Sequence, residues 1–359
     1  MDYQLELIDI AKHYKDFVAV DSVNLQIERG EIISLLGSSG CGKTTTLRMI
    51  AGLIEPTKGT IRIQGKDMNK IPPHKRDISM VFQNYALFPH LTVYENIVYG
   101  LKMRKIKDKA VLMRKASEMM EIVQLHGVEN RLPRELSGGQ QQRVSLARAM
   151  IVEPKLMLFD EPLSNLDAKL RERTRVEIRK LVKDMYVTAI YVTHDQEEAL
   201  TISDRIAVMN NGKIEQITVP SKLYTEPATK FIAGFVGHAN FFDGVVQEVN
   251  GNRIVVKTKG GHILSAVVAK VERAPVGAEV TLITRPENIR LREGQDEPNT
   301  VEGTVKAKIY LGATMRYLVD AGEGKEIEID VQTKDMVDCT EGDTLSFVLD
   351  ETKLILVDR

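Results

Sequence analysis

The stretch Gly37-Ser38-Ser39-Gly40-Cys41-Gly42-Lys43-Thr44 decides the fold of this 359-residue chain. It lies between an apolar run, residues 32–36, and a helix-like stretch, residues 44–51. In the pattern G-x-x-x-x-G-K-[ST], the glycines let backbone N–H groups surround phosphate oxygens, and the helix start adds a positive dipole. Lys43 would contact the β- and γ-phosphates, and Thr44 would bind Mg²⁺. The stretch predicts a phosphate loop in an α/β fold, the alternative being a glycine-rich turn with an incidental lysine.

Two carboxylates follow a second apolar run. Residues 156–159 are apolar, and Asp160 and Glu161 come directly after them. Because the carboxyl ends of parallel strands meet at one sheet edge, where ligands bind, these carboxylates would lie beside the phosphate loop. Asp160 is suited to hold Mg²⁺ through water, and Glu161 to polarise the attacking water as a base. An acidic loop that only caps a helix is the alternative.

Two more polar residues follow apolar runs of the same kind. His194 comes after residues 189–192 and could hydrogen-bond the γ-phosphate and the attacking water. Gln83 comes after residues 79–82 and could sense Mg²⁺ or water. A purely structural role is the alternative for both residues.

A second phosphate-binding surface is predicted at Leu136-Ser137-Gly138-Gly139-Gln140-Gln141-Gln142-Arg143. A serine hydroxyl and two glycines that open a helix expose N–H groups at the positive end of the helix dipole. Taken alone, this stretch could be an ordinary helix cap. Because the chain already has a phosphate loop, a second surface suits a nucleotide shared across a dimer.

In this order the motifs resemble those of ABC-transporter ATPase subunits, over residues 5–235. The match also includes an aromatic residue ahead of the phosphate loop, Tyr14, and the segment Ser164-Asn165-Leu166-Asp167. The resemblance implies a head-to-tail homodimer that binds two ATP molecules, each between one subunit's phosphate loop and the other's Leu136–Gln140 signature. Tyr14 would stack on adenine, and Asp167 would help to couple the two sites.

The roles implied for individual residues fall into three groups. Catalytic roles go to Glu161, His194, Gln83 and Lys43, and Mg²⁺ binding goes to Thr44, Gln83 and Asp160. ATP contacts go to Tyr14, Gly37, Ser38, Ser39, Gly40, Cys41, Gly42, Lys43, Thr44, Thr45, Ser137, Gly138, Gly139, Gln140 and Asp167.

A helical insert is predicted at about residues 85–152, and apolar residues recur three and four apart in residues 111–123. Its first part resembles the region of importer subunits that receives a cytoplasmic helix of the membrane partner. The resemblance implies two permease subunits that dock near residues 83–97, from Gln83 to Ile97. We expect Leu87 and Phe88 to be exposed apolar residues suited to a helix-in-groove contact, although they could instead belong to the core.

The C-terminal part differs in charge and pattern. Residues 1–235 hold 34 basic and 29 acidic residues, and residues 236–359 hold 15 and 21, which suggests a boundary. Residues 277–282 resemble residues 342–347, and residues 289–291 resemble residues 354–356 at the same offset, which predicts two related β units. The stretches Arg285-Pro286-Glu287-Asn288-Ile289 and Tyr310-Leu311-Gly312-Ala313-Thr314 resemble motifs of an accessory oligonucleotide-binding-like importer domain.

The expected architecture is therefore α/β followed by all-β. A P-loop NTPase cassette with a helical insert would occupy residues 1–235, and a double OB-like regulatory domain residues 236–359. The net charge of −1 and the acidic second part argue against a nucleic acid partner. Two cysteines indicate a reducing compartment, the start of the chain lacks the basic segment of a secretory signal, and no apolar run reaches the roughly 20 residues of a spanning helix. The resemblance implies a peripheral protein on the cytoplasmic face of the membrane.

The resemblance implies an ATPase subunit of an ABC importer, with an extracytoplasmic solute-binding protein as an indirect partner. Whole-chain similarity favours polyamine uptake, of spermidine or putrescine. Importers of ferric iron, sulfate, phosphonate or maltose-type sugars are alternatives. A soluble, non-transport ABC ATPase that acts on nucleic acid is a further one, against which the chain shows neither a coiled-coil insert nor a second cassette.

Overall fold

The computed structural model describes residues 3–269, 271–292 and 297–358, and it divides into two compact units, Met1–Ser221 and Lys222–Arg359. The sequence predicted a boundary between residues 235 and 236. Residues 222–235, which include helix α8 (Lys230–Phe235), therefore group by their contacts with the second unit. This places the division earlier in the chain than the change in charge.

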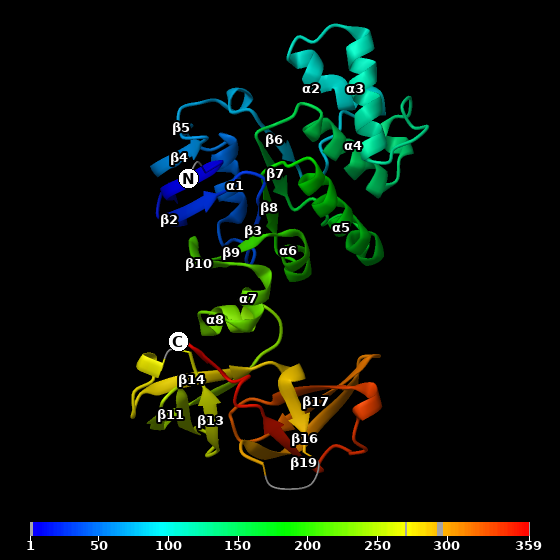
Figure 1. Ribbon diagram of the computed structural model, residues 1–359. Helices are drawn as coiled ribbons and strands as arrows, with labels where there is room; N and C mark the ends of the chain where they lie inside the picture. The colour runs from blue at the N-terminus through cyan, green and yellow to red at the C-terminus, as the bar shows by residue number, and fades with distance from the viewer. Residues whose placement is uncertain (1–2, 270, 293–296, 359) are drawn as a thin grey trace. The chain divides into compact units, whose positions relative to one another are not determined.

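The first unit is built on a six-stranded sheet (Figure 1). Neighbouring strands pair in parallel, except that β10 is antiparallel to β9. The strand order is β10 (Lys213–Thr218), β9 (Arg205–Asn210), β3 (Ile32–Leu36), β8 (Ala189–Thr193), β7 (Leu156–Asp160) and β6 (Ile78–Val81). The short strands β3, β7 and β8 are buried at every position, because helices or a second sheet cover both faces.

The two faces of this sheet pack against different layers. Ile33 and Leu35 belong to a core that includes α1 (Lys43–Ala51) and a smaller antiparallel sheet. Met157 and Tyr191 point to the other face, where the remaining helices pack. The smaller sheet has the order β2 (Phe17–Ile27), β1 (Leu5–Tyr14), β4 (Lys58–Ile63) and β5 (Lys66–Asp67).

The helical insert lies at one end of the first unit, where Figure 1 shows α2 and α3 beside α4. Thr92 and Glu95 form a reciprocal capping box at the start of α2, and Asp108 caps α3. The helices on this side of the sheet are α2 (Val93–Met103), α3 (Lys109–Ile122), α4 (Gly138–Met150), α5 (Ala168–Asp184) and α6 (Gln196–Ile202). The predicted helical character of residues 85–152 is thus confirmed for α2 to α4.

The second unit contains two five-stranded sheets, as expected for two related β units. The first has the order β13 (Ile263–Val267), β12 (Arg253–Thr258), β11 (Asn240–Asn250), β14 (Glu279–Thr284) and β20 (Ile355–Val357). The second has the order β18 (Ile327–Gln332), β17 (Thr314–Asp320), β16 (Thr300–Tyr310), β19 (Thr344–Leu349) and β15 (Ile289–Leu291). The fold class is confirmed, with an α/β cassette followed by an all-β, barrel-like domain.

The two β units exchange their last strands. The repeat makes β15 the counterpart of β20, yet β15 pairs with β19 of the second sheet and β20 pairs with β14 of the first. Each sheet is therefore completed by a strand from the other half of the repeat.

Arg285, in one of the motifs quoted above, binds the backbone of the segment that leads into the β sheets of the second unit. Its guanidinium is buried and donates to the carbonyl oxygens of Ala233, His238 and Tyr224, while it lies 4.1 Å from the centroid of the Tyr224 ring. The remaining short helices are α7 (Pro220–Thr225) and 3-10 turns at Pro73–Lys75, Pro133–Glu135, Val271–Arg273, Pro286–Asn288 and Thr333–Asp335.

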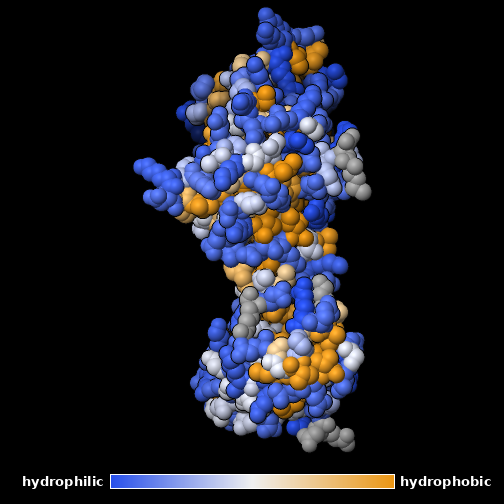
Figure 2. All heavy atoms as spheres, turned by 90° about the vertical axis from the view of Figure 1, so that its left-hand side faces the viewer, coloured by the Kyte–Doolittle hydropathy of each residue, from blue (hydrophilic) through white to orange (hydrophobic). Residues whose placement is uncertain are grey.

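Polar side chains cover most of the face drawn in Figure 2, and apolar side chains form limited patches on each unit. Patches of this kind are normal on protein surfaces. Among the described residues, no helix combines the length and the apolar character needed to cross a membrane.

Candidate functional site

The phosphate loop connects buried β3 to α1 and has the conformation that its glycines allow. Gly40 and Gly42 have φ values of 83° and 105°, in the left-handed region that favours glycine. A Cβ on Gly42 would lie 2.6 Å from the carbonyl oxygen of Ala19. Gly42 is also the N-cap of α1 and offers no side-chain oxygen to it. The first N–H groups of α1 are therefore left without a side-chain cap, as an anion site requires.

The Lys43 side chain folds back onto the phosphate loop. Its ammonium is buried and donates to the carbonyl oxygens of Gly37 and Ser38, both at 2.8 Å, and it lies 3.7 Å from the Cys41 sulfur. The positive charge is thus held over the loop. The other predicted loop residues lie around it, with Ser38, Ser39 and Gly40 exposed, Thr44 and Thr45 half-buried and Cys41 buried.

Thr44 and Asp160 meet beside the loop. The Thr44 hydroxyl donates to Asp160 Oδ1 at 3.4 Å, and Asp160 ends β7 with only 9% of its surface exposed. Burial raises the pKa of the Asp160 carboxyl, and Arg48, the Thr44 hydroxyl and Lys43 oppose this shift. Mg²⁺ takes oxygen ligands at about 2.0–2.1 Å in octahedral geometry, so these two oxygens suit adjacent ligand positions.

Glu161 and His194 form the next pair along this sheet edge. Glu161 has a φ of 47°, a left-handed conformation that costs about 1–3 kcal/mol in a residue other than glycine. Its N–H donates to Val192 O at 3.1 Å, which ties it to the end of β8. His194 Nδ1 lies 3.3 Å from Glu161 Oε2. The structure thus brings the predicted base and the predicted phosphate-binding histidine together, at the site of local backbone strain.

Gln83 follows β6 at the same edge, next to β7. Its side chain is exposed, and its carbonyl oxygen accepts a 2.9 Å hydrogen bond from Asn165 Nδ2. Asp167, at the end of the segment that contains Asn165, caps α5 by accepting from the N–H of Leu170 at 3.0 Å. The segment that follows Glu161 is therefore fastened both to the Gln83 turn and to α5.

The signature stretch opens α4 on the surface. Ser137 is the exposed N-cap, and its hydroxyl accepts from the N–H of Gln140 at 3.3 Å while the Gln140 side chain accepts from the N–H of Ser137 at 3.0 Å. Among the described residues, no hydrogen bond joins Ser137, Gly138, Gly139 or Gln140 to the phosphate loop. One chain therefore keeps its two predicted phosphate-binding surfaces unconnected by hydrogen bonds.

Tyr14 lies at the end of β1 with 44% of its surface exposed. The Lys12 ammonium lies 5.1 Å from the centroid of its ring. Phe17, at the other side of the β1–β2 turn, is 60% exposed. Exposed aromatic faces of this kind can stack on a base.

The structure adds a buried network behind His194 that the sequence did not reveal. Glu198 of α6 is buried and accepts hydrogen bonds from Tyr191 Oη at 3.1 Å and Thr193 Oγ1 at 2.8 Å. Burial raises the pKa of Glu198. Arg171 of α5 reaches Asp195, the N-cap of α6, at 3.5 Å. Only the run of charges at residues 195–198 hinted at this network, and an exposed helix start has the same pattern.

Two family models match parts of this chain. The ABC transporter family matches residues 20–164, and the TOBE domain family matches residues 282–357. A spermidine/putrescine import ATP-binding protein of Rubrobacter xylanophilus is 48% identical over 320 residues, which cover 89% of this chain and 84% of the relative. A protein of the same description from Thermobifida fusca is 46% identical over 334 residues, covering 90% and 85%.

Solved structures give the same result for the cassette. The dimeric post-hydrolysis state of the ATP-binding cassette MJ0796, bound to ADP and Pi, aligns with a TM-score of 0.54 at 33% identity. That alignment covers 60% of this chain and 98% of the other. The structure of cbiO1 from Clostridium perfringens, part of the transporter complex cbiONQ, aligns with a TM-score of 0.59 at 25% identity, covering 63% and 92%.

Proposed function

Because the chain belongs to the family of ABC-transporter ATP-binding subunits and is an ATPase, we propose that it drives the import of a polyamine, spermidine or putrescine. The observation that carries the substrate is the 48% identity, over 89% of the chain, to a spermidine/putrescine import ATP-binding protein. No residue of the cassette selects a solute in this proposal. The selectivity would belong to the membrane subunits and to an extracytoplasmic binding protein.

ATP hydrolysis would take place at the carboxyl ends of β7 and β8. Glu161 accepts a proton from the attacking water, and His194, 3.3 Å away, donates a hydrogen bond to the γ-phosphate. Lys43 and the first N–H groups of α1 neutralise the β- and γ-phosphates. Gln83, on the neighbouring strand end, orients the water from its exposed position.

Thr44, Asp160 and Gln83 would hold Mg²⁺. The 3.4 Å separation of the Thr44 hydroxyl from Asp160 Oδ1 supports the first two ligands. The ion would supply charge neutralisation for the phosphates. Asp160 must be ionised to bind it, and the cationic side chains of Lys43 and Arg48 favour that state.

The proposed active unit is a head-to-tail homodimer. The exposed position of Ser137 and Gly138 supports it, because the capping hydrogen bonds of Ser137 lie at the surface, where a second chain can reach them. The MJ0796 cassette, which shares 33% identity with this chain, is dimeric with ADP and Pi bound. Each ATP would then contact Lys43 of one protomer and Ser137 of the other.

Two permease subunits would dock on the helical insert near residues 83–97, which would place the chain peripherally on the cytoplasmic face of the membrane. Leu87 packs partly against the core, and Phe88 lies 4.5 Å from the ring of Tyr99, so these side chains are half-buried rather than fully exposed. A neighbouring cavity of about 500 Å³, lined by Tyr94, Met113 and Met120 among others, offers an apolar surface for a helix.

Reconstituted vesicles test the substrate. With the cognate membrane subunits and binding protein, ATP should drive uptake of labelled spermidine, and Lys43→Ala should abolish it. Uptake of a sugar, sulfate, phosphonate or ferric iron without polyamine uptake would refute the substrate and leave the ATPase assignment intact.

A separate pair of variants tests the docking surface. Leu87→Asp with Phe88→Asp should release the chain from its membrane partners and leave basal hydrolysis in the isolated chain. Met113→Asp, at a side chain that is 66% exposed, should do the same without loss of core packing. Full retention of membrane binding by both variants would place the docking surface elsewhere.

A further inference from the structure

The turn that follows Gln83 is strained. Tyr85 and Ala86 are consecutive non-glycine residues with φ values of 61° and 46°, both in the left-handed region. Tyr85 is bulky and 95% buried, so its conformation is imposed by its surroundings and not by freedom at the surface. Two such residues in succession persist only where other contacts hold them, and they gather at functional sites.

Arg148 of α4 supplies those contacts. Its guanidinium donates from Nη2 to Tyr85 O at 2.8 Å and from Nη1 to Ala86 O at 2.7 Å, so one planar fork holds both strained carbonyl groups. The same group lies 5.4 Å from the centroid of the Phe88 ring. Ser145, one helical turn earlier, donates to Tyr85 O at 2.9 Å. The turn is therefore fastened to the helix that begins with the signature stretch.

The other end of the turn is fastened to the catalytic edge. Asn165, four residues after Glu161, donates to Gln83 O at 2.9 Å. The backbone of Gln83 is thus held directly by Asn165, and the turn that follows it is held by Arg148 of α4. Its side chain is exposed, so its orientation depends on the backbone that carries it.

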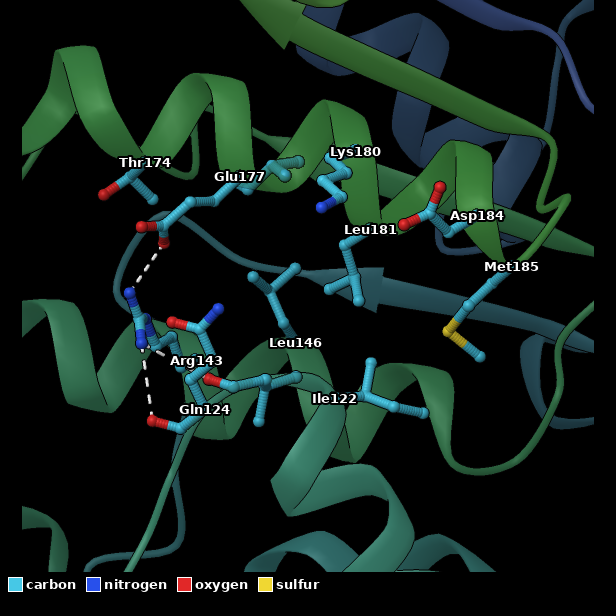
Figure 3. A pocket seen from close by; sticks show the side chains of 12 residues that line it. Ile122, Gln124, Arg143, Leu146, Thr174, Glu177, Lys180, Leu181, Asp184 and Met185 are labelled. Atoms are coloured by element: carbon cyan, nitrogen blue, oxygen red, sulfur yellow. Dashed lines mark hydrogen bonds and ion pairs between the residues drawn. The ribbon is translucent and has the colours of Figure 1, made fainter.

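Packing between α4 and α5 does not provide the same restraint. A cavity of about 410 Å³ lies between α5, the end of α3 and the middle of α4, and Leu146, Leu181 and Met185 are among the residues that line it (Figure 3). An ion pair between Arg143 Nη2 and Glu177 Oε2, 2.7 Å long, bridges its edge. This ion pair and the cavity lie apart from the turn, so the contacts of Arg148 and Ser145 are the ones that join α4 to it.

We propose that Arg148 is a positioning residue for ATP hydrolysis, which holds the left-handed turn at Tyr85 and Ala86 and thereby aligns Gln83 with the nucleotide. This rests on the proposed role of Gln83. Binding of ATP at the phosphate loop does not depend on Arg148. Loss of the fork therefore lowers kcat and leaves the KM for ATP nearly unchanged.

Kinetics of full-length variants provide the first test. Arg148→Ala should lower kcat about tenfold or more with little change in KM, because small misplacements of a catalytic group are costly. Arg148→Lys, which has one cationic centre and cannot span both carbonyl groups, should be intermediate. Arg104→Ala is the matched control, because Arg104 also joins the insert to the core, through Val152 O at 2.7 Å and Asp77 at 2.6 Å, without touching the turn. It should keep wild-type kcat.

Relief of the backbone strain provides the second test. Ala86 is exposed, so Ala86→Gly removes no core packing and makes the left-handed conformation easy to adopt. Ala86→Gly should therefore restore part of the kcat lost in Arg148→Ala, which a role in general stability would not predict. If Arg148→Ala does not fold, the same rescue is measured on Arg148→Lys.

Three results would overturn the proposal. They are an unchanged kcat in Arg148→Ala, an equal loss in Arg104→Ala, and failure of Ala86→Gly to rescue a folded Arg148 variant. Turnover of Gln83→Ala, measured in parallel, separates the role of Gln83 from its positioning by Arg148. Unchanged turnover in Gln83→Ala would refute the role of Gln83 itself, whereas a loss there with no loss in Arg148→Ala would refute only the positioning by Arg148.

Discussion

The first turns of α1 and α4 differ in how their unpaired N–H groups are capped. At α1 the N-cap is Gly42, which has no side-chain oxygen, and the buried Lys43 ammonium adds a positive charge. At α4 the N-cap is Ser137, which forms a reciprocal capping box with Gln140 on the surface. The first turn of α1 therefore has no side-chain cap, whereas the first turn of α4 is capped by its own side chains.

In the proposed dimer, this difference would let one chain offer its two predicted phosphate-binding surfaces to different nucleotides. The α1 start follows β3, and Thr44 and Asp160 lie beside it. In the proposal it binds the triphosphate of its own chain. The α4 start has two exposed hydrogen bonds, of 3.0 and 3.3 Å, which an incoming phosphate would replace in the proposed dimer. In the proposed dimer, this exposed surface would contact only a nucleotide that the other chain already holds.

The largest expected effect comes from a variant in which ATP can bind between α1 of one chain and α4 of the other without being hydrolysed. Glu161→Gln removes the proposed base and leaves Lys43, Thr44 and Ser137 in place. Turnover should fall by about 10²–10⁴-fold, the usual contribution of a general base, while ATP binding persists and the dimer accumulates. Sedimentation with ATP and Mg²⁺ measures the dimer. A monomeric variant with normal hydrolysis would contradict both the base and the shared site.

A direct contrast between the two starts is the next largest effect. Lys43→Ala should weaken ATP binding by the isolated chain at least about tenfold, because it removes a charged hydrogen-bond donor from the phosphates. Ser137→Arg should leave that affinity unchanged, since Ser137 would contact only the nucleotide of the other chain. Both variants should lose hydrolysis. Titration with a fluorescent ATP analogue at low protein concentration measures the affinities, and equal loss of affinity would remove the distinction between the starts.

Mixed dimers sharpen the comparison further. A dimer of one Lys43→Ala chain and one Ser137→Arg chain has one site with both lesions and one site with neither. Hydrolysis should be partly recovered relative to either variant alone. Verified mixed dimers with no recovery would contradict the head-to-tail arrangement, unless hydrolysis requires two intact sites. A dimer of one wild-type chain and one Lys43→Ala chain distinguishes these explanations, because it has one intact site in either case.

The α1 start could be predicted from sequence because its chemistry is local. The spacing of Gly37, Gly42 and Lys43 specifies a backbone shape without reference to the rest of the chain. The strand ends that carry Asp160, Glu161 and His194 were also predictable, since parallel strands bring such residues to one edge. The structure confirms that these residues meet.

Features that depend on distant partners were not predictable. Arg148 lies in an ordinary amphipathic pattern, and nothing in residues 138–150 shows that it grips Tyr85 and Ala86. The internal repeat showed two β units, but strands β15 and β20 are too short to reveal which sheet each completes. Leu87 and Phe88 were expected on the surface and are half-buried, because the insert packs against them.

The smallest predicted effect separates the two roles of Ser137. Ser137→Ala removes the cap of α4 and should lower the free energy of unfolding by about 0.5–2 kcal/mol, whereas Ser137→Gly should cost only a few tenths. If the hydroxyl binds the nucleotide of the other chain, both variants should lose hydrolysis to a similar degree despite their different stabilities. Urea unfolding and ATPase rates of the two variants measure this. Should activity instead follow stability, with Ser137→Gly nearly as active as wild type, the hydroxyl serves only as a cap, and the N–H groups of Gly138 and Gly139 carry the contact to phosphate.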